Sequence, residues 1–186
     1  MISVKGSVLR TRLAFVRDLA PEDGVDRVLE RLTPSDRDVL GSLLASAWYP
    51  FDLGSRLDEA IVQELGGGRA EFFEKLGEAS ADKNLGAGGV HRRFLVPGDP
   101  QAFLAKTPLI YSYYYDAGRR DYERAGEKEA VLTTHDSLTF SAPDCLTVVG
   151  WYRRALEMCG AASPRVVEEE CRAKGGAVCR YRLSWS

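Results

Sequence analysis

The sequence predicts an α+β protein in which N-terminal helices pack on a C-terminal antiparallel sheet of about four strands. Apolar residues recur at helical spacing through most of residues 1–117, whereas β-branched residues and strand-like alternation dominate after Gly118. The later elements follow in the order strand, strand, helix, strand, strand. We therefore expect a single domain over residues 1–186, with a mainly helical part at 1–117 and an α+β part at 118–186.

Amphipathic segments separated by turn residues account for the helical part. We expect Ser7 to cap the first helix and Thr33, followed by Pro34, to cap the third. The glycines at 66–68 separate the fourth helix from the next one, at 69–85. The segment 101–118 is predicted to be helical, although its dense tyrosines are also compatible with a strand.

The α+β part is read from alternation and from turn residues. Its expected elements are strands at 119–126 and 129–140, a helix at 144–160 capped by Asp144 and ended by Gly160, and hairpin strands at 165–175 and 177–185 that turn at Gly175 and Gly176.

Composition narrows the class of protein. The net charge of −2 comes from scattered charges, without the concentrated basic face of a nucleic-acid binder. The first residues lack the apolar core of a signal peptide, and no apolar run reaches the ~18 residues of a membrane span. We therefore expect a cytoplasmic protein without nucleic-acid partners, whose four cysteines are reduced. In a reducing compartment, clustered cysteines indicate metal binding more readily than a disulfide framework.

A group of cysteines and one glutamate is the main candidate for chemistry. Cys145 begins a predicted helix, Glu168 lies in the first hairpin strand, and Cys171 and Cys179 flank the hairpin turn. Side chains at 168 and 171 fall on opposite faces of a regular strand, so a shared site requires a bulge or a strand end. Three thiolates and one carboxylate would close a tetrahedral shell around a structural Zn²⁺. The alternative is four reduced cysteines as small core residues, with solvated glutamates.

Two C-terminal motifs carry a family resemblance. The stretches "DCLTVVGWYRRALEMCG" and "VEEECRAKGGAVCRYRLSW" resemble the C-terminal half of the four-vinyl-reductase domain, which has a cysteine before a glycine-containing helix, Glu-x-x-Cys, and a second cysteine eight residues later. That domain is a small-molecule-binding module related to the haem nitric-oxide-binding fold and to vesicle-tethering subunits. The resemblance implies that Cys145, Glu168, Cys171 and Cys179 hold Zn²⁺, and leaves Cys159 as a spare thiol.

The whole chain also resembles a family of paralogous myxobacterial proteins of unknown function. The shared stretches are "VKGSVLRTRLAFV", "WYPFDLGSRLDEAI", "FFEKLGEASADKNL", "YYYDAG", "GWYRRALEMCGA" and "CRAKGGAVCRYRLSW". This resemblance covers nearly the full length and supplies no activity.

The four-vinyl-reductase resemblance implies a pocket for a small hydrophobic or aromatic ligand between helices and sheet. Aromatic residues suit such a pocket, although any one of them can instead be core. The residues that we expect to line it are Trp48, Tyr49, Phe72, Phe94, Phe103, Tyr111, Tyr114 and Trp151. In the sensor proteins that carry this domain, a histidine and a tryptophan grip the ligand, and neither His91 nor His135 can be aligned with that histidine. Haem or tetrapyrrole binding is a lesser expectation, because His91 follows a helix instead of lying on one.

No catalytic motif emerges from the sequence. It lacks a G-x-S-x-G elbow, a phosphate-binding loop and any nucleophile–base pair that spacing would support, so we expect a protein that is not an enzyme. The sequence favours a ligand-binding sensor with a structural zinc site that relays to a protein partner. The alternative is an interaction adaptor or homodimer of the same fold without a ligand. The tyrosines expected at the surface and the "WYPF" stretch favour it, because aromatic residues are common at protein interfaces.

Overall fold

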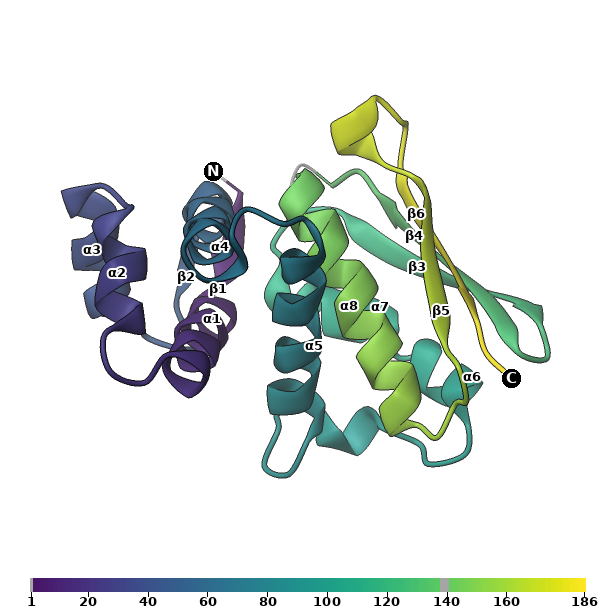
Figure 1. Cartoon of the computed structure of the whole chain (residues 1–186). Helices are drawn as coiled ribbons and strands as arrows, with labels where there is room; N and C mark the ends of the chain where they lie inside the picture. Colours follow the sequence, from purple (N-terminus) through teal and green to yellow (C-terminus); the bar gives the residue numbers. More distant parts are fainter. Residues whose placement is uncertain (1, 138–140) are drawn as a thin grey trace.

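The computed structural model describes residues 2–137 and 141–186 and confirms the α+β class (Figure 1). The helices are α1 (Gly6–Leu19), α2 (Gly24–Glu30), α3 (Pro34–Gly41), α4 (Phe51–Gly66), α5 (Glu71–Leu85), α6 (Pro100–Leu104), α7 (Thr107–Tyr114) and α8 (Ala142–Met158), with short 3₁₀ turns η1 (Arg92–Phe94) and η2 (Arg172–Lys174). The strands are β1 (Ser3–Lys5), β2 (Trp48–Pro50), β3 (Arg119–Gly126), β4 (Glu129–His135), β5 (Arg165–Glu170) and β6 (Cys179–Ser184).

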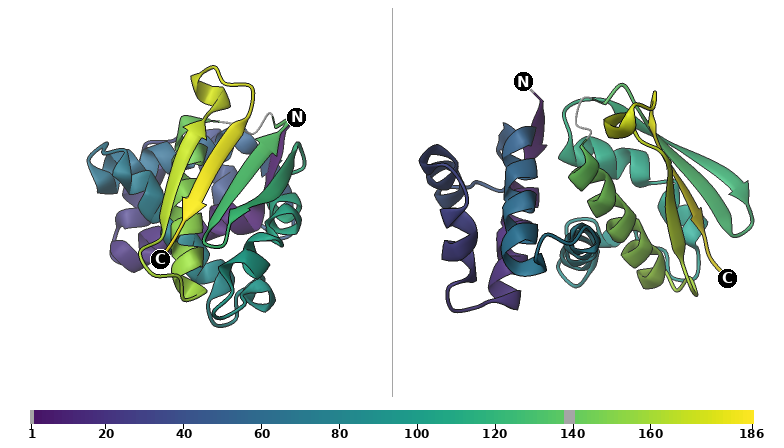
Figure 2. Two further views of the ribbon diagram at one scale, coloured as in Figure 1. Left: turned by 90° about the vertical axis from the view of Figure 1, so that its right-hand side faces the viewer. Right: turned by 45° about the horizontal axis from the view of Figure 1, so that its top comes forward.

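The predicted C-terminal sheet forms as an antiparallel sheet in the order β3-β4-β6-β5. Its two hairpins meet along β4 and β6, where Leu132 is paired with Tyr181. Helix α8 packs against one face of this sheet (Figure 2). A second, two-stranded sheet pairs β1 with β2, and was not predicted because three-residue strands are too short to show alternation.

Two hydrophobic clusters hold the helices in place. One cluster joins α5, α7 and α8 to the sheet and contains Phe103, Leu132, Leu156, Tyr181 and Leu183. The other joins α1 to α5 and contains Leu9, Leu57, Ile61 and Leu76. Helix α5 contributes to both clusters and therefore connects the N-terminal helices to the rest of the protein (Figure 1).

Helices α5 and α8 touch through their backbones at two glycines. A Cβ atom on Gly77 of α5 would collide with the carbonyl oxygen of Thr147, and one on Gly150 of α8 would collide with the carbonyl oxygen of Glu74. The contact is flanked by Arg153, which pairs with Glu74 at 2.6 Å. The close approach of α5 and α8 therefore requires glycine, which has no side chain, at positions 77 and 150.

Several predicted boundaries shift by a few residues. Thr33 caps α3 as predicted, with its hydroxyl accepting from the amide of Asp36. Ser7 does not cap α1, because β1 runs directly into the helix and Lys5 takes that position. The cap of α8 is Ser141, not Asp144, whose amide donates to the serine hydroxyl at 3.2 Å.

The ends of two predicted strands also differ. β4 ends at His135, and the predicted residues 138–140 of that strand lie outside the described residues. β5 ends at Glu170, because the chain enters η2 directly after Cys171. The segment 101–118 is mainly helical, as α6 and α7.

Candidate metal centre and ligand cavity

Three elements bring three of the four cysteines together. Cys145 lies in the first turn of α8, Cys171 follows β5, and Cys179 begins β6. The Cys145 Sγ lies 3.4 Å from the Cys171 Sγ and 3.8 Å from the Cys179 Sγ. All three sulfurs lie within 4.8 Å of one another, and all three residues are buried. The helix start and the hairpin thus converge on a compact thiol cluster.

Glu168 borders this cluster through an irregularity in β5. The pairing register of β5 with β6 shifts between Glu168 and Glu170, and the strand ends before Cys171. This bulge and strand end interrupt the regular alternation, so the side chains of Glu168 and Cys171 are not forced onto opposite faces. Among the described residues, the metal-ligating atoms within 4.8 Å of one another are the three sulfurs, and Glu168 is not a member of that group.

The Glu168 carboxylate is only half satisfied. Its Oε2 accepts a hydrogen bond from the Lys174 Nζ at 2.8 Å. Its Oε1 is buried and finds no hydrogen-bond partner among the described residues. A buried carboxylate oxygen without a partner is costly, and a cation at the cluster would satisfy it.

The thiols differ in acidity because they hydrogen-bond to one another. The Cys145 thiol stabilises the Cys179 thiolate and lowers the pKa of Cys179, with the Arg172 amide as a further donor at 3.5 Å. The same interaction raises the pKa of Cys145. Burial raises the pKa of Cys171. A soft, sulfur-rich donor set with one carboxylate suits Zn²⁺, which binds cysteines as thiolates.

Cys159 lies apart from the cluster, directly after the last residue of α8, and is fully buried in the core. Burial raises the pKa of its thiol to about 11. It is therefore a packed core residue at the far end of the helix that carries Cys145.

A cavity of about 70 Å³ lies among α1, α5, α7, α8 and β3. Three of the aromatic residues that the sequence singled out, Tyr111, Tyr114 and Trp151, line it. The full lining is Val8, Arg12, Gly77, Ser80, Asn84, Ile110, Tyr111, Tyr114, Tyr115, Arg120, Thr147, Val148, Trp151 and Tyr152. The cavity thus receives side chains from both parts of the chain.

The other five predicted pocket residues lie elsewhere. Phe72 is buried among the N-terminal helices and Tyr49 packs against the same cluster. Phe103 is buried in the sheet-side core, against which Phe94 packs. Trp48 is exposed on β2, with the Lys5 ammonium over its ring.

Arg120 is a cavity residue that sequence reasoning missed. Its guanidinium donates to the Thr134 hydroxyl at 3.0 and 2.9 Å and to the Tyr152 hydroxyl at 2.9 Å. It also lies over the ring of Tyr111, 4.9 Å from the centroid. Side chains alternate between the two faces of β3, so one of the neighbouring residues Arg119 and Arg120 had to point inward. Because both are arginines, the sequence does not show which one.

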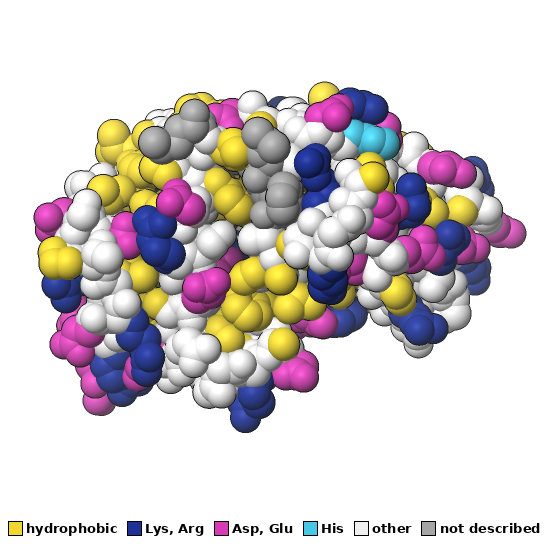
Figure 3. Space-filling model, turned by 90° about the horizontal axis from the view of Figure 1, so that it is seen from above, with side chains coloured by type: hydrophobic (Ala, Val, Ile, Leu, Met, Phe, Trp, Pro, Cys, Tyr) yellow, Lys and Arg dark blue, Asp and Glu magenta, His cyan; other side chains and the backbone are white. Residues whose placement is uncertain are grey.

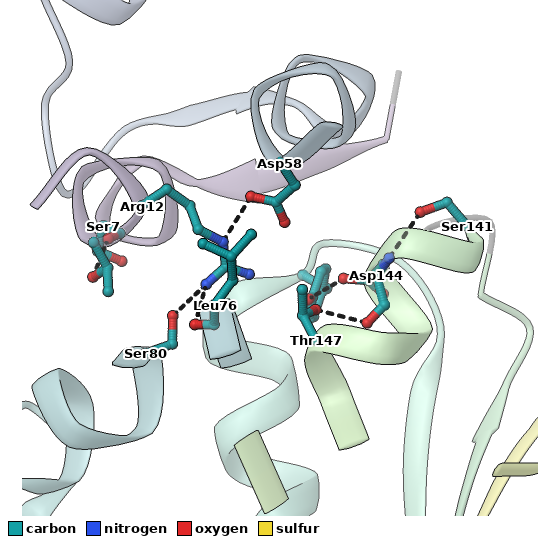
Figure 4. A network of polar contacts seen from close by, with 10 residues as sticks. Ser7, Arg12, Asp58, Leu76, Ser80, Ser141, Asp144 and Thr147 are labelled. Carbon is teal, nitrogen blue, oxygen red and sulfur yellow. Dashed lines mark hydrogen bonds and ion pairs between the residues drawn. The ribbon is translucent and has the colours of Figure 1, made fainter. Parts of the chain in front are cut away.

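A polar network beside the cavity joins the N-terminal helices to α5 (Figure 4). The buried Arg12 pairs with Asp58 of α4 at 2.7 Å and donates to the Leu76 carbonyl and the Ser80 hydroxyl of α5. Burial raises the pKa of Asp58. The Arg12 guanidinium uses its Nε and Nη1 groups in these contacts and ties three helices together at the cavity wall.

A second part of the network reaches α8. The Tyr115 hydroxyl donates to the Asp144 carboxylate at 3.0 Å. Burial raises the pKa of Asp144 to about 7. The first turn of α8 is thus linked to α7 directly beside the residue that carries the first thiol of the cluster.

His91 is buried without a hydrogen-bond partner on either ring nitrogen among the described residues. Its ring packs edge-on against Tyr113 and Tyr114, with centroids 4.9 and 5.1 Å apart, and lies near Phe94. Burial, followed by the charge of Arg93, lowers the pKa of His91 to about 4. The imidazole is therefore neutral in the folded protein at pH 7.

We expect this histidine to make the fold sensitive to acid. Its pKa is lower in the folded state than in the unfolded chain, so the unfolded state gains a proton as the pH falls below about 6.5. Between pH 7 and 5 the free energy of unfolding should fall by about 1–2 kcal/mol from this residue alone. Denaturant unfolding of His91→Phe should show a correspondingly smaller fall than the wild type. Equal pH dependence in both proteins would contradict the prediction.

The arrangement of these elements defines the H-NOX fold. A mutant H-NOX protein from S. oneidensis in the Fe(II) ligation state matches with a TM-score of 0.76 at 14% identity, over 98% of this chain and 96% of that one. A mutant Fe(II) unliganded H-NOX protein from K. algicida matches at 0.70 and 16%, over 98% and 96%. A structure that probes heme distortion in the H-NOX family matches at 0.72 and 13%, over 98% and 95%.

The chain belongs to the family described as "Protein of unknown function (DUF2378)", whose model matches residues 43–186. No curated protein matches the sequence. The kinship with the haem nitric-oxide-binding fold is thus found at the level of fold. The four-vinyl-reductase resemblance and the myxobacterial kinship stay predictions.

The cavity does not fit the haem group that the H-NOX fold suggests. Pockets for drug-sized ligands measure about 300–1,000 Å³, and a porphyrin belongs to that size class. The cavity here has a volume of about 70 Å³, and His91 is not among its lining residues. Bulky rings on α7 and α8, those of Tyr111, Tyr114, Trp151 and Tyr152, line the space instead.

Proposed function

We propose that this protein is a non-enzymatic, small-molecule-binding sensor module that acts in the cytoplasm, contains a structural zinc site and relays ligand binding to a protein partner. The observation that carries the proposal is the cavity at the meeting point of α1, α5, α7, α8 and β3. A ligand there would contact the N-terminal helices and the sheet-bearing part at once. Its binding would therefore change how these elements pack.

Helix α7 is the element that would pass the change to the surface. Its Tyr111 and Tyr114 line the cavity. Its Leu109 and Tyr113 are exposed, at 62% and 42%. A small shift of this short helix would alter an apolar surface to which a partner can bind.

The zinc ion would fix α8, which lines the cavity, to the β5–β6 hairpin. Cys145 would anchor the start of α8, and Cys171 and Cys179 would anchor the β5–β6 hairpin, with Glu168 as the fourth ligand. α8 contributes Thr147, among others, to the cavity wall. Four protein ligands leave no open coordination position, which is why the site is proposed to be structural.

The second candidate is an adaptor or homodimer of the same fold. It is favoured by exposed apolar side chains outside the cavity, such as Leu44 at 65% and Trp48 at 42%. The face seen from above carries apolar side chains and charges of both signs without a single dominant sign (Figure 3). That face is compatible with a protein partner and does not resemble a nucleic-acid interface. In the described residues no helix is long and apolar enough to cross a membrane.

Thermal unfolding of the zinc-loaded chain against a library of small metabolites tests the sensor proposal. A ligand at about 100-fold its Kd should add about 2.7 kcal/mol to the free energy of unfolding. Val148→Phe, which fills the cavity, should remove the effect, and Val167→Phe on the exposed face of β5 should not. Stabilisation that survives Val148→Phe would contradict a cavity ligand. Concentration-dependent dimerisation without any stabilising ligand would favour the adaptor.

A further inference from the structure

The charge balance of the cavity indicates what it binds. Its lining contains two arginines, Arg12 and Arg120, and no aspartate or glutamate. Arg12 is neutralised by Asp58 at 2.7 Å. Arg120 is 8% exposed and forms no ion pair within 4.0 Å among the described residues; its guanidinium lies over the rings of Tyr111, Tyr152 and Tyr181, and its charge acts on Asp144 only from a longer distance. A buried cation without a counterion is costly, so this wall favours an anion.

The guanidinium also has unused donors. An arginine has five N–H groups. In Arg120 three of these donate, two to Thr134 and one to Tyr152, which leaves one on each terminal nitrogen. An unused N–H on each terminal nitrogen can donate a charge-assisted hydrogen bond to an anion such as a carboxylate.

A second group on the same wall lacks a partner. The Tyr114 hydroxyl is buried without a hydrogen-bond partner among the described residues, and Tyr114 lines the cavity. Burial raises the pKa of this phenol, so it stays a protonated donor at every physiological pH. The nearby Asp144 does not line the cavity and accepts the Tyr115 hydroxyl. Unused donors of Arg120 and Tyr114 thus belong to two residues that line the same space.

The size and the remaining walls limit the anion. An engineered cavity of about 150 Å³ holds one benzene molecule, so about half of that volume holds a smaller molecule. The cavity measures about 70 Å³ and has Val8, Ile110 and Val148 on its walls. An alkyl chain of about two to four carbons with one charged head matches this space and these walls.

We propose that the cavity binds a short-chain aliphatic monocarboxylate, with its carboxylate held by Arg120 and the Tyr114 hydroxyl and its alkyl group against Ile110 and Val148. This inference deepens the proposed sensor function and rests on it. The carboxylate supplies the counterion that Arg120 lacks, and its two oxygens accept the unused N–H and O–H groups.

Calorimetric titration of the zinc-loaded full chain with sodium propionate tests the inference. The neutral isostere propionamide is titrated in parallel, with ionic strength held constant by sodium chloride. We expect propionate to bind at least about tenfold more tightly than propionamide, because hydrogen bonds between charged partners are stronger than those between a charged and a neutral group. Arg120→Met should abolish the difference. Arg124→Met, on an exposed position of the same strand, should leave it unchanged.

A second variant guards against misfolding of the first. Arg120→Lys keeps the charge but loses the paired N–H geometry, and should weaken propionate binding several-fold while the circular dichroism spectrum stays that of the wild type. Equal binding of propionate and propionamide, or unchanged binding by Arg120→Met, would overturn the carboxylate inference. If the library instead yields neutral cavity ligands, the sensor proposal stands without it. If neither propionate nor any library compound stabilises the protein, both fail.

Discussion

Replacing Cys145 by alanine should abolish zinc binding and lower the free energy of unfolding by about 3 kcal/mol or more. Its Sγ lies 3.4 and 3.8 Å from the other two sulfurs of the cluster, so it is the thiol that joins α8 to the hairpin. Its loss would leave two thiols on the hairpin and none on the helix. Metal analysis after purification without chelator, combined with denaturant unfolding, measures both effects.

Cys159→Ala, directly after the last residue of α8, is the matched control. Cys159 is also fully buried, but it lies at the far end of α8 from the cluster. We expect this variant to keep about one equivalent of zinc and to lose about 1 kcal/mol through reduced packing. A strong chelator should lower the melting temperature of the wild type and of Cys159→Ala, and should leave that of Cys145→Ala unchanged.

Two results would contradict the zinc site. One is wild-type protein that contains less than about a tenth of an equivalent of zinc, since structural sites bind with apparent free energies of about 10–16 kcal/mol. The other is Cys145→Ala that retains the metal. Cys171→Ser and Cys179→Ser extend the test to the hairpin, whose β5–β6 turn should lose its protection from hydrogen exchange first.

The fold was largely predictable because its elements have regular periodicities. The apolar stripe of α4, with Leu53, Leu57 and Ile61 all buried, is an example. The helix caps were less certain, since Ser141 and Asp144 are both good capping residues three positions apart. Only the structure shows that the serine lies outside the first turn.

The candidate sites were less predictable. Strand alternation places Glu168 and Cys171 on opposite faces, and the bulge that brings them together is not encoded in any pattern of side chains. The sequence predicts that aromatic residues such as Phe72 and Trp151 are buried. It does not predict which of the two hydrophobic clusters each ring joins. The same holds for Arg120, because the sequence does not show that its guanidinium lines the cavity and bonds to Thr134 and Tyr152.

In this protein the H-NOX fold carries a small cavity lined by arginine and aromatic side chains. The fold is determined by the element order and the packing of α8 on the sheet, which are properties of the backbone and the core. The cavity is determined by a few side chains on α7, α8 and β3. Large residues there can reduce the space without changing the topology, since the ligand of a fold depends on its site.

The contact between α5 and α8 should be the most sensitive point of the backbone. Gly77→Ala would place a methyl group against the carbonyl of Thr147, and Gly150→Ala would place one against the carbonyl of Glu74. Backbone atoms of two packed helices cannot move aside as side chains do. We expect each substitution to lower the free energy of unfolding by about 3 kcal/mol or more, despite the higher helix propensity of alanine.

Gly54→Ala in α4 is the matched control. Its new methyl group would lie 3.4 Å from a methyl of Leu9, an ordinary contact, so the variant should be neutral or more stable by up to about 1 kcal/mol. The double variant Gly77→Ala/Gly150→Ala should lose less than the two single losses together, because one separation of the helices relieves both collisions. Gly77 also lines the cavity, so a folded Gly77→Ala protein should have altered ligand binding. If either single variant were as stable as the wild type, the backbones of α5 and α8 would not be in contact. The arrangement of these two helices in the cavity wall would then differ from the one described.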